Sequence, residues 1–102
     1  MSRELLTQDV IDQRLGDLHA DWSGSTQELR RSIEFAGFPT AVEFITRLAP
    51  ICEEIDHHPD LDLRWRTVNI SLATHSSGGV TDMDFMLAGH VDEVAGQLPK
   101  AR

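Results

Sequence analysis

One long amphipathic stretch, GFPTAVEFITRLAPICEEID at residues 37–56, restricts the fold more than any other part of the sequence. Its apolar residues recur at helical spacing, which predicts a single buried stripe. The stripe consists of Ala41, Phe44, Ile45, Leu48, Cys52 and Ile55. Pro39 suits the first turn, Pro50 predicts a kink, and the helix should end near Asp56, because Pro59 follows closely. This stripe needs a partner surface, and a chain of 102 residues has room for about one domain.

Two alternating segments supply that partner surface as half-buried strands. In ELRRSIEF, residues 28–35, the apolar side chains share one parity and Arg31 interrupts them. In LDLRWRTVNISLATH, residues 61–75, a tight turn near Trp65 separates two strands, of which the second is the clearer. The segment around Trp22 is the expected hairpin partner of the first strand.

Helices are predicted near both ends of the chain. Thr7 can cap the first helix, whose apolar face consists of Val10, Ile11, Leu15 and Leu18. The last helix covers TDMDFMLAGHVDEVAGQL, where Thr81 and Asp84 have capping-box spacing. The order is helix, strand, strand, helix, strand, strand, helix. It predicts an α+β two-layer sandwich, with three helices on one face of a four-stranded antiparallel sheet. We expect one domain over residues 1–102, with a core of about 5–97.

Composition excludes several classes of function. The formal net charge is −8 and the pI is about 4.9, which disfavours nucleic acid and acidic membrane surfaces as partners. No apolar run approaches the roughly 20 residues of a membrane span, and the N-terminus does not resemble a signal peptide. Cys52 is the only cysteine, so a disulfide framework is excluded and a reducing cytoplasm is expected.

The stretch EEIDHHPD, residues 53–60, places two adjacent histidines between the main helix and the next strand. Adjacent side chains point about 100° apart on a helix and to opposite faces on a strand, so His57 and His58 should not face one packed surface. Glu53 lies four residues before His57 and should reach and orient its ring. His75 ends the last strand, and helix and strand ends are where small-molecule sites gather.

Simpler explanations of these residues are open at this point. Each histidine can be an ordinary surface or core residue, as we expect of His19 and His90, and Asp84 can be a helix cap only. Trp22 and Trp65 can pack in the core or a hairpin. Three histidines and a carboxylate can also bind zinc. However, no HxH or HxxxH pair favours convergence on one ion, so no metal site is expected.

The same residues resemble the pterin-4a-carbinolamine dehydratases. The pattern of that family is an acid, three residues, His-His-Pro, five or six residues, an aromatic, nine residues, a histidine and then an aspartate, with a tryptophan early in the chain. Those places are filled here by Glu53, His57, His58, Pro59, Trp65, His75 and Asp84, with Trp22 as the early tryptophan. FAGFPTAVEF and GVTDMDFMLA are similar to the family's two helix entries. The resemblance covers about residues 5–97, and the departures are Pro50, Leu61-Asp62-Leu63 and Val80.

The resemblance implies a reaction and roles for the histidines. Family members remove water from 4a-hydroxytetrahydropterins to give quinonoid dihydropterins, which belongs to the recycling of the tetrahydropterin used by aromatic amino acid hydroxylases. His57 would be the general acid at the 4a-hydroxyl, held by Glu53, and His75 the second acid–base group. His58 would bind and position the pterin. Histidine suits both proton transfers, since its unperturbed pKa of about 6.5 lies near neutral pH.

The resemblance also implies supporting residues and partners. Asp84 would support a histidine or its loop, while Pro59, Trp22 and Thr74 would contact the substrate. The adjacent histidines would line one cleft as the chain turns. No cofactor besides the pterin substrate is implied, and a homodimer or homotetramer is expected. The alternative function is a non-catalytic binding or assembly cofactor for a partner protein on the same fold.

Overall fold

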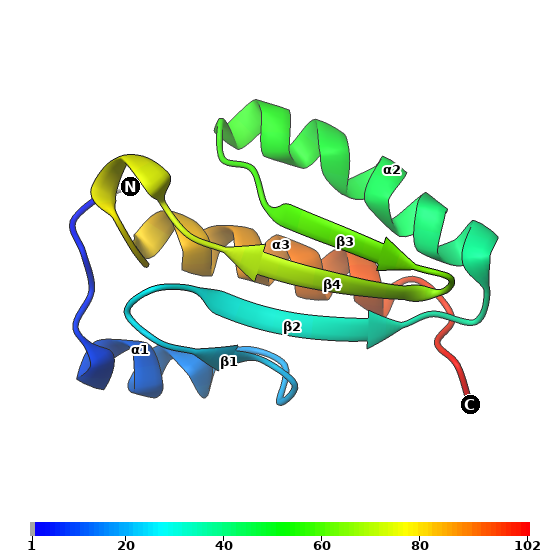
Figure 1. Cartoon of the computed structure of the whole chain (residues 1–102), viewed down its shortest axis with the longest axis horizontal. Helices are drawn as coiled ribbons and strands as arrows, with labels where there is room; N and C mark the ends of the chain where they lie inside the picture. Colours follow the sequence, from blue (N-terminus) through cyan, green and yellow to red (C-terminus); the bar gives the residue numbers. More distant parts are fainter. Residues whose placement is uncertain (1) are drawn as a thin grey trace.

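The computed structural model describes residues 2–102 and confirms the predicted order of elements (Figure 1). The elements are α1 (Gln8–Leu15), β1 (Ser23–Gly24), β2 (Leu29–Glu34), α2 (Phe38–Ile55), β3 (Asp60–Arg64), β4 (Thr67–Leu72), the 3-10 turn η1 (His75–Ser77) and α3 (Asp82–Gly96). The fold is the expected α+β sandwich, and only η1 stands where a strand end was predicted.

The sheet has four antiparallel strands in the order β1-β2-β4-β3. The expected hairpin near Trp22 is present, because Ser23 pairs with Arg30 across β1 and β2. In β2 and β4 every second side chain is turned inward, and Leu29 lies opposite Leu72 in the register. A one-residue slip would expose this whole apolar set, so the alternation fixes the pairing.

The helices cover one face of the sheet and leave the other face open (Figure 1). Inward side chains of β2 and β4 pack against α2 and α3, as the predicted stripe requires. The largest fully buried side chains are Phe35, Phe44, Ile11, Leu29, Leu48, Ile70, Leu72 and Leu87. Within residues 2–102, none of the helices has both the length and the apolar composition that a bilayer crossing requires.

The predicted helix caps are confirmed at the N-termini of α1 and α3. The Thr7 side chain accepts the backbone N–H of Val10 at the start of α1. Thr81 and Asp84 form the complete capping box at the start of α3. Only part of the predicted face of α1 is buried, because Ile11 is fully buried whereas Val10 is 37% exposed.

The end of α2 decides how the two adjacent histidines separate. The helix continues without interruption through Pro50 and is capped by Asp56, whose φ of 53° and ψ of 47° are left-handed. The N–H groups of Asp56 and His57 bond back to carbonyls of the last turn, including that of Cys52. This left-handed cap turns the chain sharply, so His57 no longer continues the helical spacing.

The strand before α3 is shorter than the alternation predicted. β4 ends at Leu72 and does not reach His75. Instead the N–H of Thr74 donates to the carbonyl of Gly79 at 2.9 Å, and Gly78 takes the left-handed φ of 82° that closes the loop. This loop returns the chain to Thr74 and places His75 in η1, next to the start of α3.

Candidate functional site

The centre of the site is a buried pair between His57 and Asp84. His57 Nε2 lies 2.6 Å from Asp84 Oδ1, and the two side chains are 7% and 0% exposed. The other carboxylate oxygen accepts the Thr74 hydroxyl and the Thr81 backbone N–H, each at 2.9 Å. Asp84 therefore has a full set of partners although it is completely buried, which is what a buried carboxylate needs.

The same contacts fix the direction of the His57 ring. If Nε2–H donates to Asp84, then Nδ1 is the ring atom left for chemistry. Within residues 2–102 no protein group bonds to Nδ1, and the buried polar side-chain atom without a partner in that range is Nε of Arg31. Nδ1 of His57 is therefore reachable from solvent while the opposite side of the ring is anchored.

His58 carries its own carboxylate, and this corrects one sequence prediction. The expected contact of Glu53 with His57 is wrong: the Glu53 carboxylate bonds to Nε2 of His58 instead. The spacing argument assumed helical continuation, whereas the left-handed Asp56 redirects the chain before His57. The His58 and Glu53 side chains are 53% and 76% exposed, so this pair lies at the surface.

His75 faces a third carboxylate that the sequence did not reveal. Its Nε2 lies 3.8 Å from Oδ2 of Asp60, the first residue of β3, and the two side chains are 77% and 73% exposed. This distance is an ion-pair contact and is too long for a hydrogen bond. Only the position of Asp60, two residues after His58, could have pointed to it.

The three histidine–carboxylate pairs gather at one end of the sandwich. Asp84 bonds to Thr74, which directly precedes His75, and His75 faces Asp60, which follows the His-His-Pro segment. At this end α2 finishes, β3 starts, β4 has just finished and α3 begins (Figure 1). The structure thus brings all three predicted histidines, Glu53 and Asp84 into one region.

A mainly apolar groove of about 260 Å³ lies beside His58. It is lined by Ile45, Leu48, Ala49, Cys52, Glu53, His58, Pro59 and Leu61. His57 does not line this groove, and the expectation that both histidines line one cleft stays a prediction. Burial raises the pKa of the Cys52 thiol at the groove wall, and the thiol therefore stays protonated near neutral pH.

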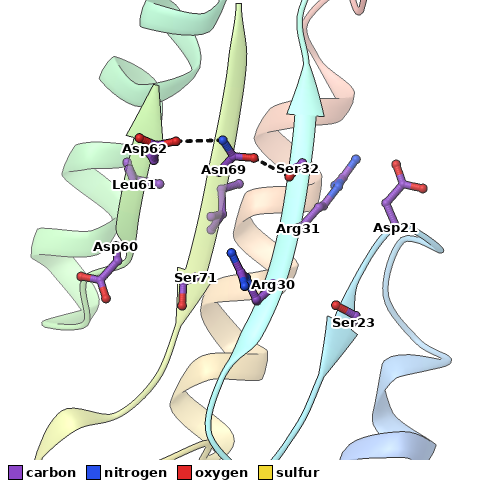
Figure 2. Close-up of a pocket in the computed structure, with 11 residues that line it drawn as sticks. Asp21, Ser23, Arg30, Arg31, Ser32, Asp60, Leu61, Asp62, Asn69 and Ser71 are labelled. Carbon is purple, nitrogen blue, oxygen red and sulfur yellow. Dashed lines mark hydrogen bonds between the residues drawn. The ribbon is translucent and has the colours of Figure 1, made fainter. Parts of the chain in front are cut away.

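A larger polar hollow of about 900 Å³ lies on the open face of the sheet (Figure 2). Asp60 lies at its β3 edge and Asp21 at the opposite edge. Between them, Asp62, Asn69 and Ser32 form a row of hydrogen bonds across three strands. The hollow meets the histidine region through Asp60, which contacts His75.

Two residues expected to contact the substrate, Trp22 and Thr74, are buried and hydrogen-bonded within the protein. Trp22 is 6% exposed, and its indole N–H donates to Asp92, which also pairs with the buried Arg31. Asp92 lies eight residues after Asp84, about 12 Å further along α3, so the Trp22 ring belongs to the core. Thr74 is 1% exposed and its hydroxyl is engaged by Asp84 and Thr81, so it supports His57 instead.

The remaining aromatic and histidine residues lie elsewhere. Trp65 is 68% exposed at the β3–β4 turn, at the other end of the sheet, where the Arg66 guanidinium stacks on its ring. The backbone of His19 is held by Asp92, and His90 is half-buried on α3. Across residues 2–102, no three His, Cys, Asp or Glu side chains are gathered as metal ligands would be.

Comparisons with known proteins identify the family of the chain. The sequence profile of the family described as pterin 4 alpha carbinolamine dehydratase matches residues 4–94. A relative from Roseiflexus castenholzii is 43% identical over 90 residues, which are 88% of this chain and 96% of that protein. One from Nocardia farcinica is 44% identical over 95 residues, 93% of this chain and 99% of that protein. Both carry the provisional name of pterin-4-alpha-carbinolamine dehydratase.

Solved structures give the same fold with more than one described role. A Brucella melitensis protein described as a transcriptional coactivator/pterin dehydratase superposes with a TM-score of 0.84 at 33% identity, covering 89% of this chain and 98% of that one. A pterin dehydratase-like protein identified as a RuBisCO assembly factor in the alpha-carboxysome gives a TM-score of 0.62 at 25% identity, covering 74% and 87%. By sequence and by structure, this chain belongs to the pterin-4a-carbinolamine dehydratase family.

Proposed function

We propose that this protein is a hydro-lyase that removes water from a 4a-hydroxytetrahydropterin to give the quinonoid dihydropterin. The observation that carries the proposal is the buried His57–Asp84 pair, which leaves Nδ1 of His57 accessible beside two further histidines. In this reaction the bond between C4a and the hydroxyl oxygen breaks, N5 loses its proton, and one water leaves. Both proton transfers suit imidazole groups, which contribute about 10² to 10⁴ in rate when positioned.

His57 is the general acid in this mechanism. Its protonated ring delivers the Nδ1 proton to the departing 4a-hydroxyl, while Nε2–H stays bonded to Asp84. The carboxylate fixes the orientation and stabilises the charged ring in a water-poor setting. Thr74 and the Thr81 N–H hold the carboxylate in turn, so the acid is anchored through two layers of contacts.

His75 and His58 have different duties on the exposed side. His75 accepts the proton from N5, since it lies free in solvent and can pass the proton to water. His58, oriented by Glu53, binds the pterin together with Pro59 at the mouth of the apolar groove. The proton balance closes without a metal, a nucleotide or a covalent intermediate, so we propose no cofactor.

The test is dehydration of a 4a-hydroxytetrahydropterin followed by absorbance, with the uncatalysed reaction subtracted. His57→Ala and His75→Ala should each lower the catalysed rate by about 10² to 10⁴. His19→Ala and His90→Ala are matched controls that keep the wild-type rate. Near-normal rates in His57→Ala and His75→Ala variants with native circular dichroism would refute the assignment.

The alternative is a binding or assembly protein, which the described roles of the solved relatives make worth testing. The favouring feature here is a row on the outer side of α2, where Phe38 is 51% and Val42 39% exposed. We propose that this row takes part in a homodimer or homotetramer. A Phe38→Glu variant that loses self-association but keeps dehydration would separate the two functions, whereas a folded wild type without dehydration would favour the assembly role.

The biological setting is a proposal too. A dehydratase of this kind would serve an aromatic amino acid hydroxylase, whose reaction forms the 4a-hydroxy compound. We propose a cytoplasmic location, because the only cysteine is buried and reduced. The formal net charge of −8 disfavours nucleic acid as a partner.

A further inference from the structure

A pterin has a recognition edge that the proposed mechanism leaves without a partner. The 2-amino group and N3–H of its pyrimidine ring are neighbouring donors, and they point away from the 4a carbon. A carboxylate matches such a pair, because its two oxygens accept two parallel hydrogen bonds. The site therefore needs one accessible carboxylate with unused acceptors, close to the acid–base groups.

Most carboxylates near the histidines are already occupied. Asp84 accepts three hydrogen bonds and is completely buried. Glu53 is bonded to His58. Asp62, on the same face of β3, accepts from Arg64 at 3.1 Å and from Asn69 at 2.9 Å. These bonds lower the pKa of Asp62, the bond from Asn69 being the larger cause, so this carboxylate is ionised and engaged.

Asp60 is different. Within residues 2–102 its side chain accepts no hydrogen bond, and its one close charged contact is His75 at 3.8 Å. Figure 2 shows its carboxylate at the start of β3, clear of the other labelled side chains, whereas Asp62 is joined to Asn69. Ser71, its partner across the sheet, is held by Glu28 and does not compete for it.

We propose that Asp60 recognises the amino-pyrimidine edge of the substrate and thereby sets specificity for 2-amino pterins. This inference rests on the proposed dehydratase function. A ring held at Asp60 lies beside His75, and Asp60 directly follows Pro59 at the mouth of the apolar groove. The charge of Asp60 thus serves binding, while the histidines carry the protons.

The test compares two ligands and two variants. The probes are 7,8-dihydropterin and its analogue without the 2-amino group, with dissociation constants measured by calorimetry. Asp60→Asn turns one acceptor into a donor. It should raise the dissociation constant of 7,8-dihydropterin roughly 10- to 100-fold, the effect expected for one hydrogen bond to a charged group. The analogue should bind both proteins within about threefold. Asp62→Asn removes a charge from the same face of β3 and is the matched control.

Each other outcome overturns the inference. Equal weakening of both ligands would mean that Asp60 acts through His75 or through the fold, and no weakening would mean that it does not touch the ligand. The proposed function is judged separately, by dehydration with the wild-type protein. If the wild type dehydrates its substrate but Asp60→Asn does not discriminate between the ligands, only the inference about Asp60 fails.

Discussion

Replacing Asp84 tests the central pair of the site most directly. The Asp84→Asn side chain can keep its carbonyl oxygen toward the Thr74 hydroxyl and the Thr81 N–H, which are the two donors at Oδ2. Its amide nitrogen then faces Nε2 of His57, where Oδ1 had accepted. Two donors would meet unless His57 moves its proton to Nδ1, so the variant changes the tautomer of the His57 ring.

The magnitudes follow from the number of bonds lost. Asp84→Asn loses one charge-assisted bond, about 1.5–3 kcal/mol, or roughly 10–20 °C in Tm for a domain of this size. Asp84→Ala leaves the Thr81 N–H and the His57 ring without their partner in a fully buried place and should cost about 3–5 kcal/mol. That is a large part of the roughly 5–15 kcal/mol that holds such a domain together.

Thermal and urea unfolding followed by circular dichroism would measure these differences, alongside the dehydration rate. The Asn variant should stay folded at 25 °C and lose most of its activity, because a neutral His57 ring without a carboxylate at Nε2 is a much weaker proton donor than the charged ring. Asp82→Ala is the control in the same helical turn. Asp82 pairs with Arg14 while partly exposed, so its loss should cost less than about 1 kcal/mol. An Asp84→Ala protein within 1 kcal/mol of wild type would refute the reasoning.

Two further predictions concern the loop and the thiol. Gly79→Ala should destabilise the protein by about 1–3 kcal/mol in urea unfolding, because a Cβ there would clash with the Thr26 backbone carbonyl oxygen. Gly89→Ala, with open space around it, should stabilise the protein by about 0.5–1 kcal/mol. Equal effects of the two would contradict this packing argument. Cys52 should resist a thiol reagent at pH 8 until urea unfolds the protein, because burial raises its pKa above 9.0. The stability from this raised pKa is present below pH 9 and is lost as the pH rises through the folded value, so Cys52→Ala should flatten the fall in urea midpoint between pH 8 and 10. Rapid labelling of the folded protein would contradict it.

The parts of the fold that follow local rules were predictable. Alternation gave the faces of β2 and β4, and helical spacing gave the buried stripe of α2. The capping box of Thr81 and Asp84 was readable because it spans only one turn. These patterns depend on neighbours within a few residues, which is the range over which a single sequence is informative.

The errors arose where distant contacts or special backbone angles decide. The partner of Trp22 is Asp92, seventy residues later in the sequence, and nothing near Trp22 indicates it. Glu53 bonds to His58 and not to His57 because Asp56 is left-handed. Aspartate adopts this conformation only in some contexts. His75 lies outside β4 because Gly79 pairs with Thr74 and closes a loop around it. Alternation of side chains cannot show such a loop closure.

The left-handed residue at the end of α2 has a consequence for how the site can change over time. By sending His57 inward and His58 outward, Asp56 gives two neighbouring imidazoles separate surroundings and separate carboxylates. A mutation at Glu53 or in the groove can then change the surroundings of His58 without disturbing the buried His57–Asp84 pair. One backbone turn thus makes a dipeptide into two independently adjustable parts.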